Sequence, residues 1–355
     1  MTAGKEVSSA MFRRRNYNAT VAKIMAIYGK RLKPQDYIEM MNKQSVSEAA
    51  EYLKKNTHYS ELLSSIDTNI IHRGMLENLL RRSVFDTYMR ITGFEHISKQ
   101  EFYNYKILQT EIDEILRCIR FINAGSEKLI ADIPIYLNGL MSFDLIELAK
   151  ISDFKELLVF LRKTPYRDVF KTVSVNDDGK VDVTECETIL RTYYIKRLKE
   201  SLHFKKEDVK KFVSFLETDI DLINIINAYR LTAFFGASDD VIEKDMLPSE
   251  GGLSPAKQKE IYSADSSEEF IRRFSRTSYG RQMIENGYDI NDLEQSASKL
   301  RYKYAKLMLK TSSSAPLSVY SFMFLLEIEV KNIISIIEGI RYGVEASKIA
   351  PLIIM

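Results

Sequence analysis

The sequence predicts an all-α protein made of three similar helical domains. Its 355 residues include only 14 glycines and 7 prolines, and both residues are needed to punctuate strands and tight turns. No stretch alternates polar and apolar residues for long enough to form a sheet. Two short motifs recur three times in the same order, which predicts a triplicated unit of about 110 residues.

The first recurring motif is a capped helix that ends in Thr-x-Tyr. Its three copies end at Thr57-His58-Tyr59, Thr164-Pro165-Tyr166 and Thr277-Ser278-Tyr279. A serine or aspartate lies 12 residues before each threonine, and such side chains accept hydrogen bonds from the free N–H groups of a first helical turn. These predicted caps are Ser45, Ser152 and Asp265. The apolar residues behind them have helical spacing, with a slip of one residue in the first copy.

The second motif lies in a longer helix that closes each copy, where an acidic residue is followed three positions later by Asn or Glu. The pairs are Glu111 and Glu114, Asp221 and Asn224, and Glu329 and Asn332. The Thr-x-Tyr tyrosine precedes the acidic residue by 52, 55 and 50 residues. Each pair shares a helix face, so it could serve metal or acid–base chemistry. Because catalytic sites rarely come in triplicate, we favour a structural role in which these groups bind neighbouring segments through hydrogen bonds.

The triplicated unit predicts domains at residues 1–127, 128–237 and 238–355. Each domain has two longer helices behind its Thr-x-Tyr motif. They are predicted at 62–90 and 100–123, at 181–202 and 206–235, and at 290–309 and 317–342. Loops are predicted where Gly, Pro, Asn and Asp gather, at 124–126, 175–179, 248–255 and 311–316. After the third of these, Ser254 is the expected cap and Pro255 the first helical residue.

The charge balance excludes sequence-blind binding to polyanions. There are 51 Lys and Arg residues against 49 Asp and Glu residues, a net charge of +2, so no strong overall field attracts nucleic acid or an anionic membrane. The local clusters Arg13-Arg14-Arg15 and Arg81-Arg82 are interpreted as solvated helix faces rather than phosphate sites.

Two features favour a cytoplasmic protein that does not span a membrane. Cys118 and Cys186 are the only cysteines, which indicates a reducing compartment rather than a disulfide framework, and the polar N-terminal segment lacks the apolar core of a signal peptide. The most apolar stretch, residues 317–340, carries Glu327, Glu329 and Lys331 near its middle. Such charges are costly at a bilayer centre, so we predict a helix with a buried face there.

No motif predicts catalysis, a cofactor or a metal. The P-loop pattern is missing, and Gly251-Gly252 forms a turn without the preceding strand of a dinucleotide-binding fingerprint. The four histidines have no zinc-ligand spacing with one another or with the cysteines; they are His58, His72, His96 and His203. A spatially assembled Ser/His/Asp triad stays open, although no nucleophile-elbow sequence supports one. We predict a non-catalytic protein with no catalytic, cofactor-binding or metal-ligating residue.

One loop imitates a calcium site. Residues 174–185 carry oxygen-bearing side chains at loop positions 1, 3, 5, 9 and 12, with Gly179 at position 6. Position 1 is Ser174 instead of Asp, and no partner hand follows. The segment also falls where a turn between two helices is needed. We interpret it as a turn rather than a calcium site.

With the repeats in place, the sequence resembles the C subunits of the V/A-type rotary ATPases of archaea and some bacteria, the counterparts of the eukaryotic d subunits. The resemblance covers nearly the whole chain and depends on the order and spacing of its motifs. It is carried by residues 17–25, 29–32 and 36–37 near the start, by 251–253, 266–270 and 277–279 in the third repeat, and by 332–334, Gly339, Arg341 and 349–353 near the end. The acidic segment 175–182 departs from the family pattern.

The resemblance implies a pseudo-threefold, all-helical truncated cone with a central socket. It implies a subunit on top of the membrane rotor ring that holds the central shaft and passes torque between ATP chemistry and proton or sodium transport. The implied partners are the shaft subunits and the rotor-ring proteolipid, with no nucleic acid, nucleotide or cofactor. The implied location is the cytoplasmic face of the cell membrane, peripheral within the complex.

Two other classes fit the sequence less well. A helical adaptor or scaffold from another complex would also contain stacked helices, but familiar solenoid repeats span about 20–50 residues, whereas this unit is the size of a domain. A helical enzyme would need a polar cluster inside an apolar helix that is not repeated threefold, and the sequence shows none.

Overall fold

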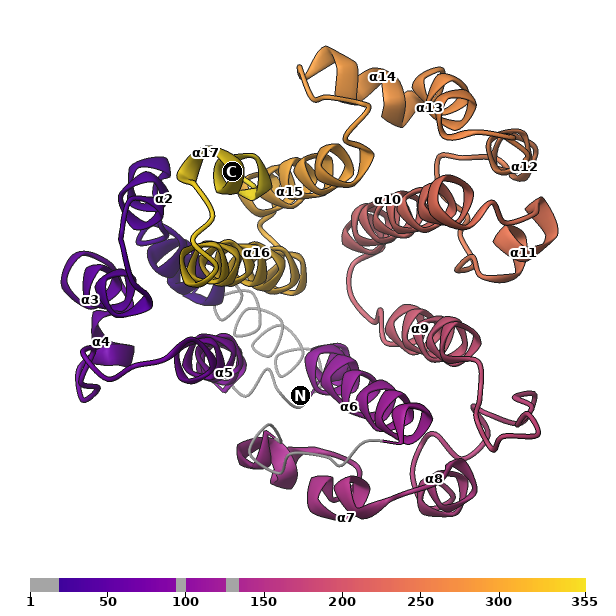
Figure 1. The fold of residues 1–355 in the computed structure, drawn as a ribbon, viewed down its shortest axis with the longest axis horizontal. Helices are drawn as coiled ribbons and strands as arrows, with labels where there is room; N and C mark the ends of the chain where they lie inside the picture. The colour runs from indigo at the N-terminus through magenta and orange to yellow at the C-terminus, as the bar shows by residue number, and fades with distance from the viewer. Residues whose placement is uncertain (1–18, 94–99, 126–133) are drawn as a thin grey trace, which may run out of the picture. The chain divides into compact units, whose positions relative to one another are not determined.

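The computed structural model describes residues 19–93, 100–125 and 134–355, which fold into helices joined by short turns (Figure 1). Within these ranges there is no strand, only one isolated antiparallel bridge between Val175 and Val181. The predicted all-α class is confirmed. The chain forms two compact units, Met1–Ser98 with Phe274–Met355, and Lys99–Arg273. The three domain boundaries drawn from the repeats stay a prediction.

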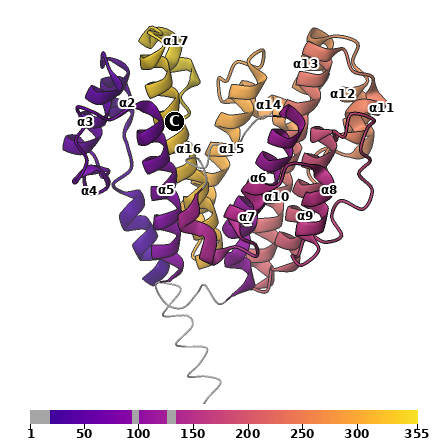
Figure 2. The same cartoon turned by 60° about the horizontal axis from the view of Figure 1, so that its bottom comes forward.

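The first unit is built around α16 (Ala315–Arg341), which packs against helices from both ends of the chain (Figure 2). Its neighbours are α2 (Pro34–Met41), α3 (Val46–Asn56), α5 (Arg73–Thr92), α15 (Leu293–Thr311) and α17 (Ala346–Ile349). The unit also contains a helix over 19–28, α4 (Ser60–Leu63), α14 (Ser278–Glu285) and η6 (Ala350–Leu352). Buried apolar residues lie along most of α16, which explains why it can accept neighbours on several sides.

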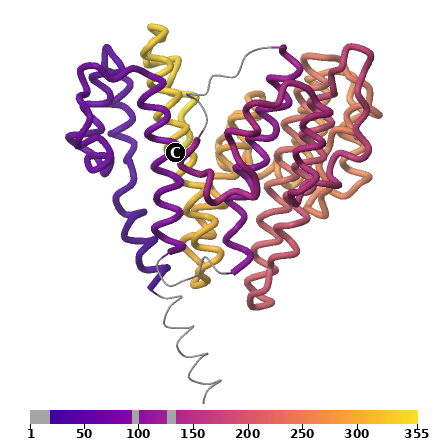
Figure 3. Tube along the Cα trace, turned by 90° about the horizontal axis from the view of Figure 1, so that it is seen from below, coloured from indigo at the N-terminus to yellow at the C-terminus, as the bar shows by residue number. Residues whose placement is uncertain are grey.

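The second unit is the middle of the chain, where α6 (Tyr105–Ala124) packs against α9 (Val183–Glu200) and α7 (Leu145–Lys150) (Figure 3). Its other elements are η2 (Glu101–Asn104), η4 (Ile135–Leu140), α8 (Phe154–Leu161), α10 (Lys206–Arg230), the π-helical turn η5 (Leu231–Phe235), α11 (Asp239–Lys244) and α12 (Pro255–Tyr262). The segment α13 (Ser267–Ser275) crosses the boundary between the units. Edge-to-face contacts of Phe102 with Phe204 and Phe212 contribute to the core.

The predicted caps are right in one copy and displaced in two. The hydroxyl of Ser45 accepts a hydrogen bond from the Glu48 amide at 3.1 Å and starts α3. In the other copies the capping residue lies one position later than predicted, at Asp153 instead of Ser152 and at Ser266 instead of Asp265. The cap therefore lies 12 residues before the threonine in the first copy and 11 in the others. This difference explains the one-residue slip in the apolar pattern.

The threonine of each Thr-x-Tyr motif closes one helical turn and starts the next. The Thr57 hydroxyl donates to the Leu53 carbonyl at 2.6 Å and accepts from the Tyr59 amide at 3.2 Å. Thr164 makes the same two bonds, to the Leu161 carbonyl and from the Tyr166 amide. A threonine satisfies both a terminal carbonyl and a following amide, which accounts for its recurrence at this place.

One long predicted helix is wrong. Residues 62–90 contain the end of α4, a turn, and then α5, which begins at Arg73 behind the capping residue His72. The turn forms because the Asp67 carboxylate accepts from the Asn69 amide at 3.0 Å, a local bond that competes with helix formation. The cap Ser254 and first-turn Pro255 of α12 are confirmed.

None of the helices in the described ranges is both long and apolar enough to cross a membrane. This includes α16, which contains the apolar stretch 317–340. The cluster Arg13-Arg14-Arg15 and His96 lie outside the described residues.

Candidate functional site

The most completely enclosed acidic group of the first unit is Glu329, in the middle of α16 and only 6% exposed. One carboxylate oxygen accepts from the Leu32 amide at 2.8 Å, where the chain enters α2. The other accepts from the Tyr59 hydroxyl at 3.0 Å and lies 3.3 Å from Nε2 of His58. A single side chain on α16 therefore fixes both the start of α2 and the turn after α3.

Burial controls the ionisation of this group. Desolvation raises the pKa of Glu329 to about 7, and the Leu32 amide and Tyr59 hydroxyl, which favour the ionised form, offset only part of the effect. Burial likewise lowers the pKa of His58 below its usual value. The carboxyl of Glu329 can therefore hold a proton near neutral pH.

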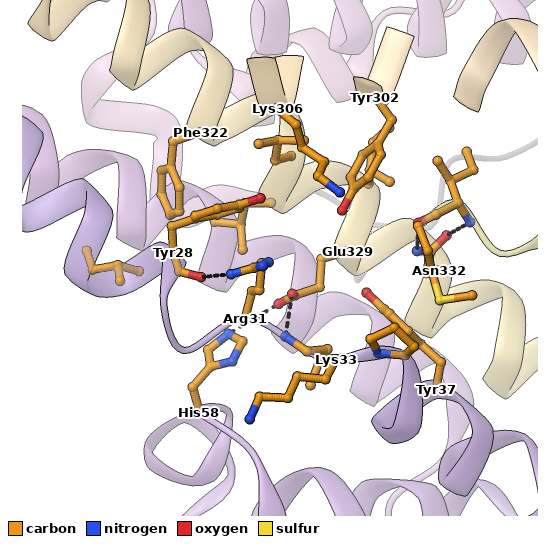
Figure 4. Close-up of a pocket in the computed structure, with 18 residues that line it drawn as sticks. Tyr28, Arg31, Lys33, Tyr37, His58, Tyr302, Lys306, Phe322, Glu329 and Asn332 are labelled. Atoms are coloured by element: carbon orange, nitrogen blue, oxygen red, sulfur yellow. Dashed lines mark hydrogen bonds and ion pairs between the residues drawn. The ribbon is translucent and has the colours of Figure 1, made fainter. Parts of the chain in front are cut away.

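A pocket of about 230 Å³ opens beside Glu329 (Figure 4). Its polar residues come from the segment 28–37, the turn after α3, α15 and α16, and its apolar residues come from α16, the segment 27–34 and the last two residues of the sequence. The polar residues are Tyr28, Arg31, Lys33, Tyr37, His58, Tyr302, Lys306, Glu329 and Asn332. Figure 4 shows the Glu329 carboxylate turned toward His58 and the Leu32 backbone, and away from Lys306 and Tyr302.

Glu111 occupies an equivalent position in the second unit. It lies on α6, is 4% exposed, and accepts hydrogen bonds from the Tyr166 hydroxyl at 2.8 Å and from the Ser142 amide before α7. Three residues along the helix, Glu114 is also buried, and its Oε1 forms an ion pair with a guanidinium nitrogen of Arg117 at 2.6 Å. Burial raises the pKa of Glu114 to about 7, with Arg117 acting in the opposite direction.

Asp221 on α10 repeats the same arrangement. Its carboxylate accepts from the Ser249 hydroxyl at 2.6 Å and from the Leu253 amide at 3.2 Å, just before α12 begins. Gly251 lies so close that a Cβ atom there would come within 2.3 Å of Asp221 Oδ2. This glycine lets the backbone approach the carboxylate.

The asparagines three residues after Asp221 and Glu329 bind extended backbone through both ends of their amides. Asn224 donates to the Leu247 carbonyl at 2.8 Å and accepts from the Leu247 amide at 2.9 Å. Asn332 does the same with Ile354, at 2.8 and 3.0 Å. The predicted hydrogen bonds to neighbouring segments are present for the first residue of every pair and for both asparagines, and they satisfy buried backbone groups. Glu114 instead pairs with Arg117 on its own helix.

The tyrosines of the first two Thr-x-Tyr motifs do not bind the acidic residues that follow them by 52 and 55 positions in the sequence. Tyr166 binds Glu111, the acidic residue that precedes it, rather than Asp221, which follows it. Tyr59 likewise binds Glu329, on the last long helix of the chain, rather than Glu111. In the second unit the Thr-x-Tyr motif thus binds the long helix that precedes it, and in the first unit the pairing joins the two ends of the chain.

The loop that imitates a calcium site forms a turn. The Asn176 side chain accepts from the Lys180 amide at 2.7 Å, and Gly179 adopts φ +77°. Asp182, at loop position 9, caps α9 by accepting from the amides of Thr184 and Glu185. In the described ranges no three His, Cys, Asp or Glu residues are grouped as a metal site would require.

The other residues considered from the sequence have local roles. The His72 ring accepts from the Met75 amide and caps α5, while His203 is exposed in the second unit. Cys118 and Cys186 are buried and form no disulfide, and burial raises the pKa of Cys186 to about 12. Arg81 pairs with Glu77 on an exposed face of α5, as the interpretation of the arginine cluster predicts.

Sequence reasoning missed the pocket itself. Arg31 and Lys306, which face it, are 275 residues apart in the chain and belong to no shared motif. Only the folding of both chain ends onto α16 brings them together.

Comparison with known proteins gives a consistent result over the whole chain. A family model described as ATP synthase (C/AC39) subunit matches residues 20–352. The A-type ATP synthase C subunit of Desulfurococcus sp. (strain SY) is 24% identical over 341 residues, which cover 95% of this chain and 90% of that protein. The proteins of the same name from Archaeoglobus fulgidus and Thermococcus gammatolerans are 21% and 23% identical, over 93% and 95% of this chain and 93% and 89% of their own lengths.

Proposed function

The chain belongs to the ATP synthase (C/AC39) subunit family, and on this premise we propose that it is the non-catalytic subunit that couples the central shaft to the membrane rotor ring. Membership makes it an accessory subunit of a membrane-associated rotary ATP synthase. The coupling of the shaft to the ring is our proposal and goes beyond membership of the family. The resemblance to the V/A-type family is confirmed.

The observation that carries the coupling role is the bracing of the long helices near their middles. α16 has 27 residues and α10 has 25, so they are about 40 and 37 Å long. Glu329 binds α16 to the turn before α2, and Asp221 binds α10 to the turn before α12. Hydrogen bonds at mid-length oppose sliding of one helix along another, because sliding would leave buried donors without acceptors. A subunit that transmits torque needs this resistance to shear.

The proposed partners are the shaft subunits and the rotor-ring proteolipid. The protein would lie at the cytoplasmic face of the membrane, held there by the complex, and would serve proton or sodium transport without a nucleotide of its own. Its interfaces would be partly apolar with polar rims, as at other protein–protein contacts.

We also propose that the chain consists of three copies of one helical unit, with domains at 1–127, 128–237 and 238–355. The repeated geometry of Glu111, Asp221 and Glu329 supports this proposal, because each carboxylate accepts from a backbone amide just before a short helix. Within each unit, the hydrogen bonds of Tyr59 and Tyr166 support packing of a Thr-x-Tyr motif on a long helix of another copy.

Native purification tests the assignment. The chain, carrying an affinity tag, is expressed in its own host, extracted from membranes in mild detergent, and analysed by native mass spectrometry. We expect it to co-purify with the shaft subunits and the ring proteolipid, in one stable complex with ATPase activity. A tagged cytoplasmic protein of similar size is the control. Recovery of the chain alone from the soluble fraction, without ATPase subunits, would contradict the proposal.

A further inference from the structure

The pocket beside Glu329 contains a buried hydroxyl that lacks a partner. Tyr28 is only 6% exposed, and its hydroxyl makes no hydrogen bond within the described part of the chain. A buried polar atom left unpaired is destabilising, so such atoms are uncommon in folded proteins unless a water, ion or ligand satisfies them. The hydroxyl is therefore available to hydrogen-bond a ligand atom.

Other polar groups converge on the same space. Figure 4 shows the Tyr28 hydroxyl directed toward the Lys306 amine and the Tyr302 hydroxyl, with the Arg31 guanidinium nearby. Arg31 is held in place by two contacts, since its guanidinium carbon lies 4.2 Å from the centre of the Tyr28 ring and one nitrogen donates to the Tyr28 carbonyl at 3.1 Å. Two segments that are distant in sequence, 28–31 and 302–306, thus present donors to one point.

The two cations at this point are not paired directly with a carboxylate of the described residues. Neither Arg31 nor Lys306 forms an ion pair in the described ranges. Burial lowers the pKa of Lys306, and the positive charges of Lys310 and Arg31 add to that effect. The charge of Arg31 favours the ionised form of Glu329, but the Glu329 oxygens accept from Leu32 and Tyr59 and form no ion pair with Arg31 or Lys306. An anion between Arg31 and Lys306 would relieve their mutual repulsion.

The donor set indicates the class of anion. Two cations and two hydroxyls match a dianion that presents three terminal oxygens, whereas a carboxylate has one charge and two oxygens. The pocket continues along apolar side chains of α16, namely Phe322, Leu325 and Leu326. Its volume of about 230 Å³ leaves room for an organic group beyond the phosphate.

We propose that this pocket binds a phosphate monoester, with the phosphate among Arg31, Lys306 and the hydroxyls of Tyr28 and Tyr302, and with the organic group against α16. The site is independent of the proposed coupling role. A bound ligand would join the exit of the helix over 19–28 to α15.

Isothermal titration calorimetry on the purified full-length chain tests the site, with phenyl phosphate as a soluble monoester and dihexanoyl phosphatidate as a monomeric lipid monoester. We expect saturable binding of at least one of them at one site, and weaker binding of inorganic phosphate. Preference for phenyl phosphate would indicate a soluble ligand, and preference for the phosphatidate a lipid headgroup. No binding of either monoester, or equal binding of neutral phenol, would overturn the proposal.

Substitutions distinguish binding in this pocket from non-specific attraction of the anion to positive charge. Arg31→Gln and Lys306→Gln should each weaken binding about tenfold, the loss expected for one charge-assisted contact. Tyr28→Phe should weaken binding severalfold while leaving the melting temperature unchanged or higher, because it removes a hydroxyl that has no partner in the free protein. The matched control is Lys310→Gln, on the next turn of α15 and outside the pocket. If Lys310→Gln lost as much affinity as Lys306→Gln, the proposal would be wrong.

Discussion

Replacing Glu329 with alanine should lower the free energy of unfolding of the chain by about 3–5 kcal/mol. The carboxylate accepts from the Leu32 amide and the Tyr59 hydroxyl, both buried, and alanine leaves both donors without an acceptor. The substitution also opens space in the middle of α16. Denaturant unfolding followed by far-UV circular dichroism measures the change.

The matched control is Glu285→Ala, which removes the same atoms from an exposed position at the end of α14. It should change the free energy of unfolding by no more than about 0.5 kcal/mol. Equal effects of the two substitutions would show that the bonds of Glu329 contribute nothing particular to stability.

Glutamine at position 329 should alter the pH dependence of stability. The pKa of Glu329 is raised to about 7 from an ordinary value of 4.5, so the folded state binds the proton more tightly than the unfolded state. This contribution to stability is therefore fully present below pH 4.5 and is lost as the pH rises to about 7. Relative to Glu329→Gln, the natural protein should lose up to about 3 kcal/mol over this range.

Unfolding curves of the two proteins at several pH values between 4.5 and 8 measure this difference. Glu114 also titrates near this range, but it is present in both proteins and its contribution largely cancels in the comparison. His58 lies 3.3 Å from Glu329, so the comparison reports these two groups together. Parallel pH profiles would contradict a buried, proton-binding Glu329.

Much of the fold was predictable because it depends on local chemistry. The scarcity of glycine and proline and the helical spacing of apolar residues predict the all-α class. The ends of helices were less predictable, since several capping residues stand in a row. Ser152 and Asp153 both suit a helix start, and the choice of Asp153 depends on where the tertiary structure places the turn. The Asx turn at Asp67 broke a predicted helix for the same local reason.

The recurring acidic residues could be found by pattern, but their partners could not. The similar spacing from each tyrosine to the next acidic residue suggested that these two belong together, whereas Tyr166 binds the acidic residue before it. Separation along the chain does not specify which copy packs on which helix. Tyr59 and Glu329 are 270 residues apart, and only the packing of α16 against α2 and α3 brings them into contact.

The pocket had no sequence signal at all. Tyr28 and Lys306 lie on helices and Arg31 lies in the turn after the first of them, and these side chains face one pocket only because the helix over 19–28 packs near α15 and α16. The absence of a hydrogen-bond partner for the Tyr28 hydroxyl can be recognised only from the tertiary structure.

The central claim is that the protein belongs to the rotor, and covalent cross-linking within the working complex tests it most directly. Single cysteines are introduced at exposed positions such as Phe235 or Tyr342, while the natural Cys118 and Cys186 are buried. Cross-linking the chain to the ring proteolipid should leave ATP-driven ion transport in proteoliposomes intact, because both parts would turn together. Loss of transport on this cross-linking, with full recovery on reduction, would contradict a place in the rotor.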